Sequence, residues 1–360
     1  MIKEESSTII SKSLLKGIPE FDNHFLVIYL HNKKAKLESY IAIHKKNGRL
    51  PSFGATRLYK YPSKKEALMD ALRLSKLMSY KSALAGLPYG GAKAVIIEPK
   101  GKFSRRKLLE AYAEELNKLK GQFITGTDVG LDVSDLKYMK KYTKYLVGYS
   151  ANPEKATALG VIKSLNTVLA CTYHNKLCSD LSFSIQGVGK VGFEILKILI
   201  EKGVRNIYIT DIDKSKIKKI IKKYPFVKVV GVDKIYCQNV DIYCPCALSG
   251  VLNNKTLKQL KCKIVAGSAN NQLKDLSIGE KLYKKGIVYC PDYVVNSGGL
   301  ISVTDEYRYG KENNERLNKK INKIGTIFKK ILVESKKKKL SPLKISEHIG
   351  LAIINKNSSK

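Results

Sequence analysis

Two lysines, Lys81 and Lys93, stand twelve positions apart around a glycine turn, with Lys93 at the edge of that turn. Two ammonium groups that face one small cavity repel each other, and partial burial also disfavours their charged forms. Both effects lower the pKa of a lysine. The pattern therefore predicts that one of the two lysines acts as a base near neutral pH.

An acidic residue follows a second short apolar run. Asp128 comes after Ile124 and Thr125 and lies between Gly126 and Gly130, as expected for a carboxylate placed at the end of a strand. Two lysines and one aspartate are sufficient to hold an amino acid by its charged groups and to move its protons.

The elements that must position these residues form a mixed α/β domain. Alternating apolar residues between 24 and 43 predict two antiparallel strands, and helical spacing predicts helices over 63–80 and 103–119. Short apolar runs at 94–97 and 123–125 predict two further strands. We expect this domain to cover residues 1–150, with a terminal helix at about 339–360 packing back on it.

From residue 151 to 338 the pattern changes to strands that alternate with helices, which predicts a doubly wound parallel sheet. The first strand, 181–186, is followed by Gly187, Val188, Gly189, Lys190, Val191 and Gly192 and then by a helix. A glycine turn that opens a helix after a strand presents backbone N–H groups and the helix dipole to a pyrophosphate. Asp211 closes the next strand, where a carboxylate accepts hydrogen bonds from ribose hydroxyls and repels a 2′-phosphate. The sequence thus predicts a dinucleotide site that prefers NAD to NADP.

The composition of the chain narrows the classes of protein to which it can belong. The chain has 360 residues and a formal charge of +35, but its lysines are scattered over helical stretches without interleaved aromatics, which favours solvated helix faces over a nucleic-acid site. Its seven cysteines show no metal-type spacing, so we expect reduced thiols and no metal. No leader pattern and no run of eighteen apolar residues is present, so we expect a cytoplasmic protein without a membrane segment.

From about His24 to Glu306 the chain resembles the Glu/Leu/Phe/Val dehydrogenase family, and most closely its leucine-deaminating members. The resemblance rests on long ordered segments, chiefly 80–93, 124–130 and 187–192. It implies an α/β fold with an N-terminal substrate and oligomerisation domain, an NAD-binding Rossmann domain and a cleft between them. It also implies a homo-oligomer that deaminates an amino acid reversibly to the 2-oxo acid and ammonia.

The same resemblance implies roles for individual residues. Lys93 corresponds to the general base and Asp128 to the second proton-transfer residue, while Lys81 and Asn271 correspond to the anchors of the substrate carboxylate. The substrate side chain is expected to meet Phe53, Gly54, Gly126, Leu300 and Val303. Further cofactor contacts are expected from Cys246, Ala247, Leu248, Asn270, Asn296 and Thr157.

Alternatives remain open at this stage. Taken alone, Lys81 also fits a surface lysine at a helix C-terminus, and Asn270, Asn271 and Asn296 fit turn-forming asparagines. The apolar set favours a branched-chain substrate such as leucine or valine, and an aromatic one such as phenylalanine is the alternative. Two departures from the family pattern, Ala55 and a shortened segment at 148–157, are consistent with a catalytically idle relative that binds NAD or an amino acid.

Overall fold

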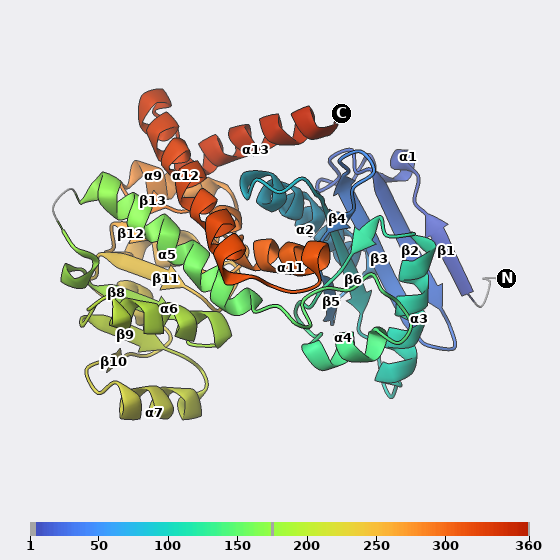
Figure 1. Cartoon of the computed structure of the whole chain (residues 1–360), viewed down its shortest axis with the longest axis horizontal. Helices are drawn as coiled ribbons and strands as arrows, with labels where there is room; N and C mark the ends of the chain where they lie inside the picture. The colour runs from blue at the N-terminus through green and yellow to red at the C-terminus, as the bar shows by residue number, and fades with distance from the viewer. Residues whose placement is uncertain (1–4, 174–175, 359–360) are drawn as a thin grey trace. The chain divides into compact units, whose positions relative to one another are not determined.

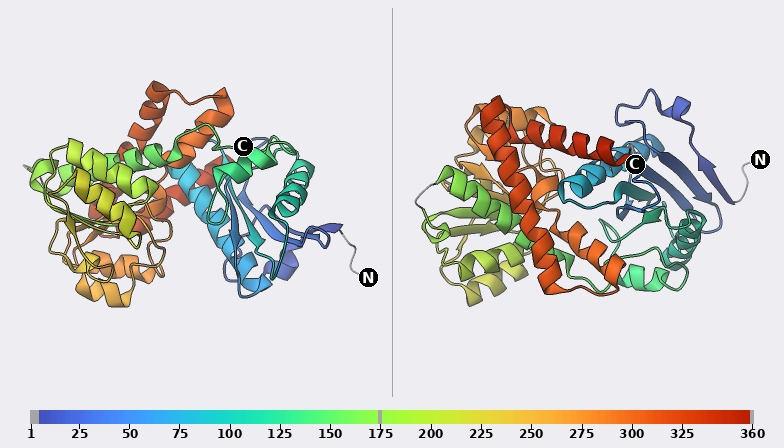
Figure 2. Two further views of the ribbon diagram at one scale, coloured as in Figure 1. Left: turned by 90° about the horizontal axis from the view of Figure 1, so that it is seen from below. Right: turned by 45° about the horizontal axis from the view of Figure 1, so that its top comes forward.

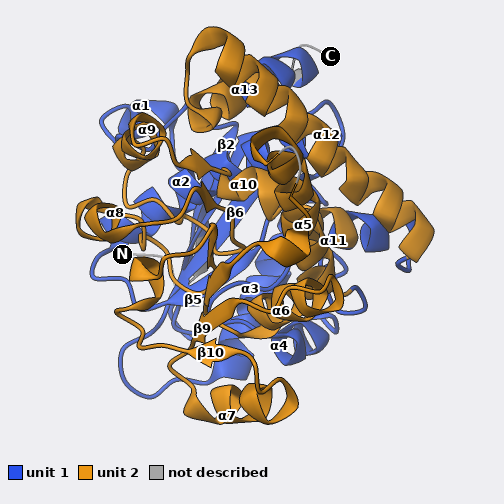
Figure 3. Ribbon diagram, turned by 90° about the vertical axis from the view of Figure 1, so that its left-hand side faces the viewer, with its two compact units in different colours: residues 1–151, 303–312, 350–360 blue, residues 152–302, 313–349 orange. Residues whose placement is uncertain are grey.

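The computed structural model describes residues 5–173 and 176–358 of the chain, which divide into two compact units (Figure 3). Unit 1 comprises residues 1–151, 303–312 and 350–360, and unit 2 comprises 152–302 and 313–349. The chain passes between the units four times. Two of the crossings follow residues 151 and 312, outside any helix, and the other two lie inside the helices α11 (Gly298–Tyr309) and α13 (Pro342–Ser358). Residues 303–312, which we expected in the second domain, therefore belong to unit 1.

Unit 1 contains a seven-stranded mixed sheet with the order β1-β2-β3-β6-β4-β7, and β5 also pairs with β6 (Figure 1). The strands β4, β5, β6 and β7 run parallel to one another, and β1, β2, β3 and β6 pair antiparallel. Its strands are β1 (Glu5–Ile9), β2 (Leu26–Asn32), β3 (Leu37–Lys45), β4 (Ser52–Phe53), β5 (Thr56–Tyr59), β6 (Gly90–Ile97) and β7 (Phe123–Ile124), and its helices are α1 (Lys12–Leu15), α2 (Lys64–Leu84), α3 (Arg105–Lys118) and α4 (Val133–Met139).

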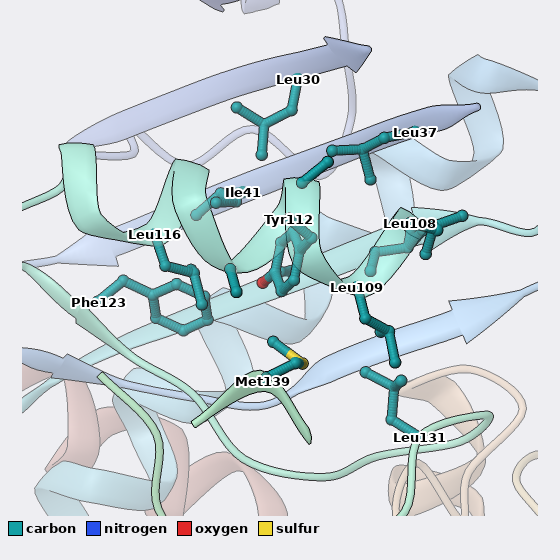
Figure 4. Close-up of a cluster of buried hydrophobic side chains, with 14 of the residues drawn as sticks. Leu30, Leu37, Ile41, Leu108, Leu109, Tyr112, Leu116, Phe123, Leu131 and Met139 are labelled. Carbon is teal, nitrogen blue, oxygen red and sulfur yellow. The ribbon is translucent and has the colours of Figure 1, made fainter. Parts of the chain in front are cut away.

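Helices cover both faces of this sheet. On one face, Leu108, Tyr112 and Leu116 of α3 pack with Phe123 and Met139 over the strands (Figure 4). On the other face, Ala67 and Ala71 of α2 pack against Ala42 and Val95. Because side chains alternate between the two faces along a strand, each position of β6 is assigned to the α2 face or the α3 face.

The helix α2 is longer than the predicted 63–80. It begins at the cap Ser63, whose side chain accepts from the N–H of Glu66, and it continues through Leu84. It stops at Gly86, which has a φ of +68°, with the N–H of Gly86 bonded to Ala83 and that of Leu87 bonded to Ser82. A glycine in this left-handed conformation relieves the strain that a side chain would suffer, and the two bonds satisfy the last carbonyls of the helix.

The glycine turn predicted beside Lys93 was wrong in position. The turn lies at Gly86, while Gly90 and Gly91 begin strand β6. A Cβ on Gly91 would lie 2.0 Å from the backbone nitrogen of Ser79, so this glycine allows α2 to approach the strand closely. Lys93 consequently stands inside a strand and not on a loop.

Unit 2 contains a six-stranded parallel sheet with the order β10-β9-β8-β11-β12-β13. Numbered from β8, this is the order 3-2-1-4-5-6 of dinucleotide-binding sheets, so the predicted fold class is confirmed. The elements are α5 (Pro153–Thr172), a 3₁₀ turn (Cys178–Asp180), β8 (Phe183–Gln186), α6 (Lys190–Glu201), β9 (Ile207–Thr210), α7 (Lys214–Lys223), β10 (Lys228–Val229), a 3₁₀ turn (Ile235–Cys237), β11 (Ile242–Pro245), α8 (Asn254–Gln259), β12 (Ile264–Val265), α9 (Ser277–Lys284), β13 (Val288–Tyr289), α10 (Asp292–Val295) and α12 (Asn314–Lys338).

The two long helices of unit 2, α5 and α12, lie against each other along one side of the sheet (Figure 2). Gly160 of α5 sits beneath the carbonyl of Val295 and the Ile324 side chain, and a Cβ there would lie 2.8 Å and 3.0 Å from them. None of the described helices is long and apolar enough to cross a membrane.

Candidate active site

Lys93 lies in the middle of β6, on the face of the sheet that α2 covers. Its cross-strand partner is Ala42, which belongs to the core beneath α2, and Val95 two residues further on belongs to the same core. The lysine is 6% exposed, so its ammonium group has little access to water. A buried ammonium is costly unless an opposite charge and hydrogen bonds compensate it.

Asp128 supplies that charge. The segment after β7 continues beside β5, with Thr127 bridged to Thr56 and the N–H of Leu58 bonded to the carbonyl of Val129. This pairing places Asp128 next to Lys93, and the lysine Nζ donates to Asp128 Oδ2 at 2.5 Å. The structure therefore brings together the two residues that we expected to transfer protons.

The sequence did not lead us to a third charged residue, Arg57 of β5. Its Nε donates to Asp128 Oδ2 at 3.1 Å, and its cross-strand partner Val95 places it on the same face as Lys93. Burial alone would raise the pKa of the Asp128 carboxyl, but the charges of Lys93 and Arg57 hold this pKa well below its usual range. The sequence did contain one indication of a role for Arg57. Arginine is scarce among the 66 basic residues, and this arginine comes shortly after Phe53 and Gly54, two of the expected substrate contacts.

Lys81 lies in the last turn of α2, close to the residues of that helix that touch β6. It is two positions beyond Ser79, and Ser79 packs on Gly91, which is two positions before Lys93. Lys81 is half-buried. The repulsion that we expected between the two ammonium groups remains a prediction.

Phe53, one of the expected substrate contacts, is fully buried. It pairs with Gly91, so alternation places its ring on the Lys93 side of the sheet. Its ring packs against Tyr89 at 4.6 Å and Tyr307 at 5.2 Å between centroids. Three aromatic rings therefore stand on this side of the sheet.

Two of the expected substrate contacts are glycines, Gly54 and Gly126, and close packing against backbone also accounts for glycine at these positions. A Cβ at Gly54 would lie 1.9 Å from the carbonyl oxygen of Ala92, which no side chain can accommodate. A Cβ at Gly126 would lie 3.1 Å from the Val147 carbonyl oxygen. A side chain at Gly126 would therefore press against the backbone of Val147.

Glu306 is a second residue that sequence reasoning missed. This carboxylate is 3% exposed and accepts from the N–H of Gly148 at 2.8 Å, the N–H of Ser150 at 3.1 Å and the Ser150 hydroxyl at 2.8 Å. It fixes the start of the shortened 148–157 segment, and Val303 lies beside Gly148 in the same unit. Nothing in the sequence around this glutamate indicated that it would bind the backbone of the 148–157 segment.

The predicted cofactor turn follows β8 in unit 2. Gly187 has a φ of +91°, and a Cβ on Gly192 would lie 2.0 Å from the Gly187 carbonyl oxygen, so strand and helix meet closely at these two positions. Gly189 begins α6 without a side-chain cap, and a Cβ there would meet nothing within 4 Å. The first N–H groups of an α-helix have no partner within the helix, so the start of α6 and the open space beside Gly189 suit a pyrophosphate.

Other residues of the predicted cofactor set surround this turn. Asp211 accepts from the N–H of Val188 at 2.9 Å, which places its carboxylate against the turn. Cys246 and Ala247 pack on Gly192 and Gly187 from the end of β11. The remaining members are Lys190, which is exposed and pairs with Glu154, the half-buried Val191, and Leu248, which is 59% exposed.

An asparagine pair forms where the chain continues beyond strands β12 and β13. Asn296 Nδ2 donates to Asn270 Oδ1 at 2.8 Å and to the Ser268 carbonyl at 3.2 Å. Asn296 is 4% exposed, and within the described chain its Oδ1 is buried with no hydrogen-bond partner. A buried acceptor without a partner is unfavourable and fits a ligand that brings an N–H donor, such as a carboxamide.

Three further expected residues belong to the same unit. Asn271 has a φ of +53°, and its backbone is held by Asp292, which accepts its N–H at 2.5 Å, and by the N–H of Gly250. Thr157 donates to the Pro153 carbonyl at 2.7 Å. Leu300 is buried at the start of α11. These three therefore lie in a different unit from Lys93 and Asp128.

Comparison with known proteins decides the family. The sequence profile of the Glu/Leu/Phe/Val dehydrogenase dimerisation domain matches residues 25–145, and that of Glutamate/Leucine/Phenylalanine/Valine dehydrogenase matches residues 207–358. The chain belongs to the Glu/Leu/Phe/Val dehydrogenase family. The resemblance found in the sequence is confirmed, and with it an oxidoreductase that acts on amino acids.

Members of the family with different substrates are similarly close. Leucine dehydrogenase of Bacillus subtilis is 37% identical over 89% of this chain and 88% of its own length. Phenylalanine dehydrogenase of Caldalkalibacillus thermarum is 38% identical over 89% of both chains. The crystal structure of L-tryptophan dehydrogenase from Nostoc punctiforme superposes with a TM-score of 0.81 and 34% identity, covering 97% of this chain and 99% of that one. Overall identity therefore does not select among amino acids, although it supports a nicotinamide dinucleotide as coenzyme.

Proposed function

We propose that this chain catalyses the NAD-dependent, reversible oxidative deamination of an apolar L-amino acid, branched-chain in the first instance, to the 2-oxo acid and ammonia. The observation that supports this most directly is the buried ion pair of Lys93 and Asp128 in a member of an amino acid dehydrogenase family. A catalytically idle relative would have no need to keep two charges buried at this cost.

The coenzyme, when bound, accepts the hydride that leaves the α-carbon of the amino acid. The residues of the chain are assigned the proton transfers and the binding. In its neutral amine form Lys93 takes a proton from the water that attacks the imine, and Asp128 exchanges protons with the substrate amine. Lys81 and Asn271 hold the substrate carboxylate, one by charge and the other by donation from its amide.

The coenzyme is assigned as NAD because of Asp211. Its carboxylate lies beside the glycine turn and would repel a phosphate on the adenosine ribose. The substrate side chain is assigned as apolar because Tyr89 and Tyr307, which pack on the buried ring of Phe53, offer it aromatic surface. The same rings favour an aromatic amino acid as the second candidate.

Assembly is assigned to unit 1, because the profile that matches residues 25–145 describes a dimerisation domain. We propose a homo-oligomer built through that unit. Light scattering coupled to size-exclusion chromatography tests this, and a monomer at micromolar concentration would contradict it.

The experiment that tests the function supplies purified protein with NADH, ammonia and a panel of 2-oxo acids, and follows the loss of NADH absorbance. The panel contains the 2-oxo acids of leucine, valine, phenylalanine, tryptophan and glutamate. We expect the branched-chain members to be reduced fastest, and the reaction without ammonia serves as the control. Absence of NADH oxidation with every member would contradict the proposal.

A further inference from the structure

The guanidinium of Arg57 joins two carboxylates that come from different parts of unit 1. Its Nε donates to Asp128 Oδ2 at 3.1 Å, and its Nη1 donates to Asp70 Oδ2 at 2.8 Å. The side chains of Arg57, Asp128 and Asp70 are 18%, 14% and 11% exposed. Ion pairs screened from water in this way are stronger and more directional than surface pairs.

Asp70 is fixed independently of the site. It lies on α2 between Ala67 and Ala71, which are both fully buried against the sheet. Its carboxylate also accepts from the Tyr61 hydroxyl at 2.7 Å and from Arg73 at 2.6 Å. The end of Arg57 that binds Asp70 is therefore held by a rigid helix.

Asp128 is held on a connecting segment, which pairs with β5 through Thr127 and Val129. It follows the two-residue strand β7 on a segment bounded by Gly126 and by Gly130, which has a φ of +80°. Two side-chain cations contact its carboxylate, Lys93 and Arg57. If Lys93 gives up its proton during turnover, it loses the charge that holds Asp128. Arginine does not lose its charge at any pH that a protein tolerates.

We propose that Arg57 is a positioning residue, which spans Asp70 and Asp128 and keeps the Asp128 carboxylate beside Lys93 throughout the reaction. The inference rests on the proposed function, since it assigns Asp128 a part in proton transfer. Arg57 supplies a constant positive charge, and Asp70 supplies the fixed point from which that charge is held. Lysine cannot replace it, because an ammonium lacks the planar fork that reaches two carboxylates at once.

The test compares Arg57→Gln and Arg57→Lys with the control Arg105→Gln. Arg105 makes a bidentate pair with Asp135 in the same unit, at 2.9 Å and 2.7 Å, and it also donates to the carbonyl of Gly130 at the end of the Asp128 segment. Its loss therefore loosens the same segment without removing a charge from the Asp128 carboxylate. We expect both Arg57 variants to lower kcat by roughly ten- to a hundredfold, as misplaced catalytic groups do. We expect Arg57→Gln, in addition, to change the shape of the pH profile of kcat, because the Lys93 and Asp128 pair loses a neighbouring cation.

A purely structural role predicts a different result. In that case Arg57→Gln and Arg105→Gln would lower the melting temperature alike, and the pH profiles of the remaining activity would superimpose on that of the parent. That outcome would overturn the inference. Should Arg57→Gln fail to fold, the kcat of Arg57→Lys is compared with that of the parent, because this variant keeps a positive charge in the buried site. Unchanged kcat in this variant would also overturn the inference.

An activity-independent measurement separates this inference from the proposed function. The Asp128 carboxyl is followed by ¹³C NMR in selectively labelled protein, with Asp128→Asn for assignment. We expect it to titrate at higher pH in Arg57→Gln than in the parent. If the parent reduces no 2-oxo acid, the proposed function fails, yet the titration still decides the role of Arg57, and an identical titration in both proteins would refute it.

Discussion

The rings of Phe53 and Tyr307 meet edge to face, with centroids 5.2 Å apart and an interplanar angle of 84°. Phe53 is fully buried on the Lys93 side of its sheet, whereas Tyr307 on α11 is 44% exposed. Tyr307 thus covers the ring of Phe53 on the side of the sheet that carries Lys93, the proposed base. This relationship bears on which amino acid the enzyme prefers.

We predict that Tyr307→Ala shifts the preference toward larger side chains. Removal of the ring exposes the edge of Phe53 and leaves space that an aromatic 2-oxo acid fills better than a branched-chain one. The ratio of kcat/KM for the phenylalanine 2-oxo acid over that of leucine is expected to rise about tenfold, within the range that apolar pocket contacts supply. Steady-state kinetics with both substrates measures this ratio.

Tyr309→Ala is the matched control, because this tyrosine is similarly exposed at 46% and lies on the same helix. We expect it to leave the ratio unchanged. An equal shift in both variants would point to a general loosening of α11 and would contradict the assignment of Tyr307.

The Lys93 and Asp128 pair gives the second prediction. Lys93→Ala removes the proposed base and is expected to lower kcat about a thousandfold, in the range that general acid–base groups contribute. NADH binding, followed by fluorescence titration, should persist because the residues proposed to bind the cofactor lie in unit 2. Lys118→Ala, which removes an exposed lysine paired with Glu115 in the same unit, should keep full activity. Parental turnover in Lys93→Ala would eliminate Lys93 as the base.

Asp211 gives the third prediction, which concerns coenzyme choice. Asp211→Asn keeps an oxygen that can accept the Val188 N–H but removes the negative charge. We therefore expect the preference for NADH over NADPH to fall about tenfold or more, because the repulsion of a 2′-phosphate is lost. The control is Asp213→Asn, since Asp213 caps α7 through the N–H groups of Ser215 and Lys216. A coenzyme ratio that is the same in Asp211→Asn and the parent would rule out the charge as its cause.

A buried histidine pair in unit 1 gives the fourth prediction, on stability and pH. Burial and the neighbouring His44 lower the pKa of His24 to about 4, while an unfolded histidine titrates near its ordinary value of 6.5. Between these two values the unfolded chain binds more protons than the folded one. The free energy of unfolding therefore falls as the pH drops from about 6.5 to about 4, by at most about 3 kcal/mol.

Burial lowers the pKa of His44 as well, so its contribution has the same sign. Melting temperatures at pH 7 and pH 5 measure the effect, and His24→Gln is expected to lose less stability over this interval than the parent. His348→Gln, which alters an exposed histidine, should behave like the parent. A parental pH dependence in His24→Gln would show that other groups cause it.

Local sequence patterns were sufficient for much of the fold and for part of the site. Alternation of strands with helices indicated the parallel sheet, because an apolar run after each helix can be buried only in such a layer. The glycine turn at 187–192 and the acid at Asp211 were recognisable because strand, turn and helix are contiguous in the chain. Lys93 and Asp128 were recognisable because each lies within an ordered motif, although their contact spans 35 positions.

The remaining features were decided by tertiary structure. Arg57 reaches Asp128 across 71 positions, and Glu306 reaches Gly148 across 158, so no local spacing could indicate either contact. Gly90 and Gly91 belong to a strand and not to a turn, and neighbouring elements leave no room for a side chain at either position. A Cβ on Gly91 would meet the backbone of α2 at Ser79, and one on Gly90 would meet the Lys45 carbonyl of β3. The sequence alone determined which residues carry charge and which segments are helices or strands. Strand register and helix packing determined which charges meet, because those interactions join residues that are distant along the chain.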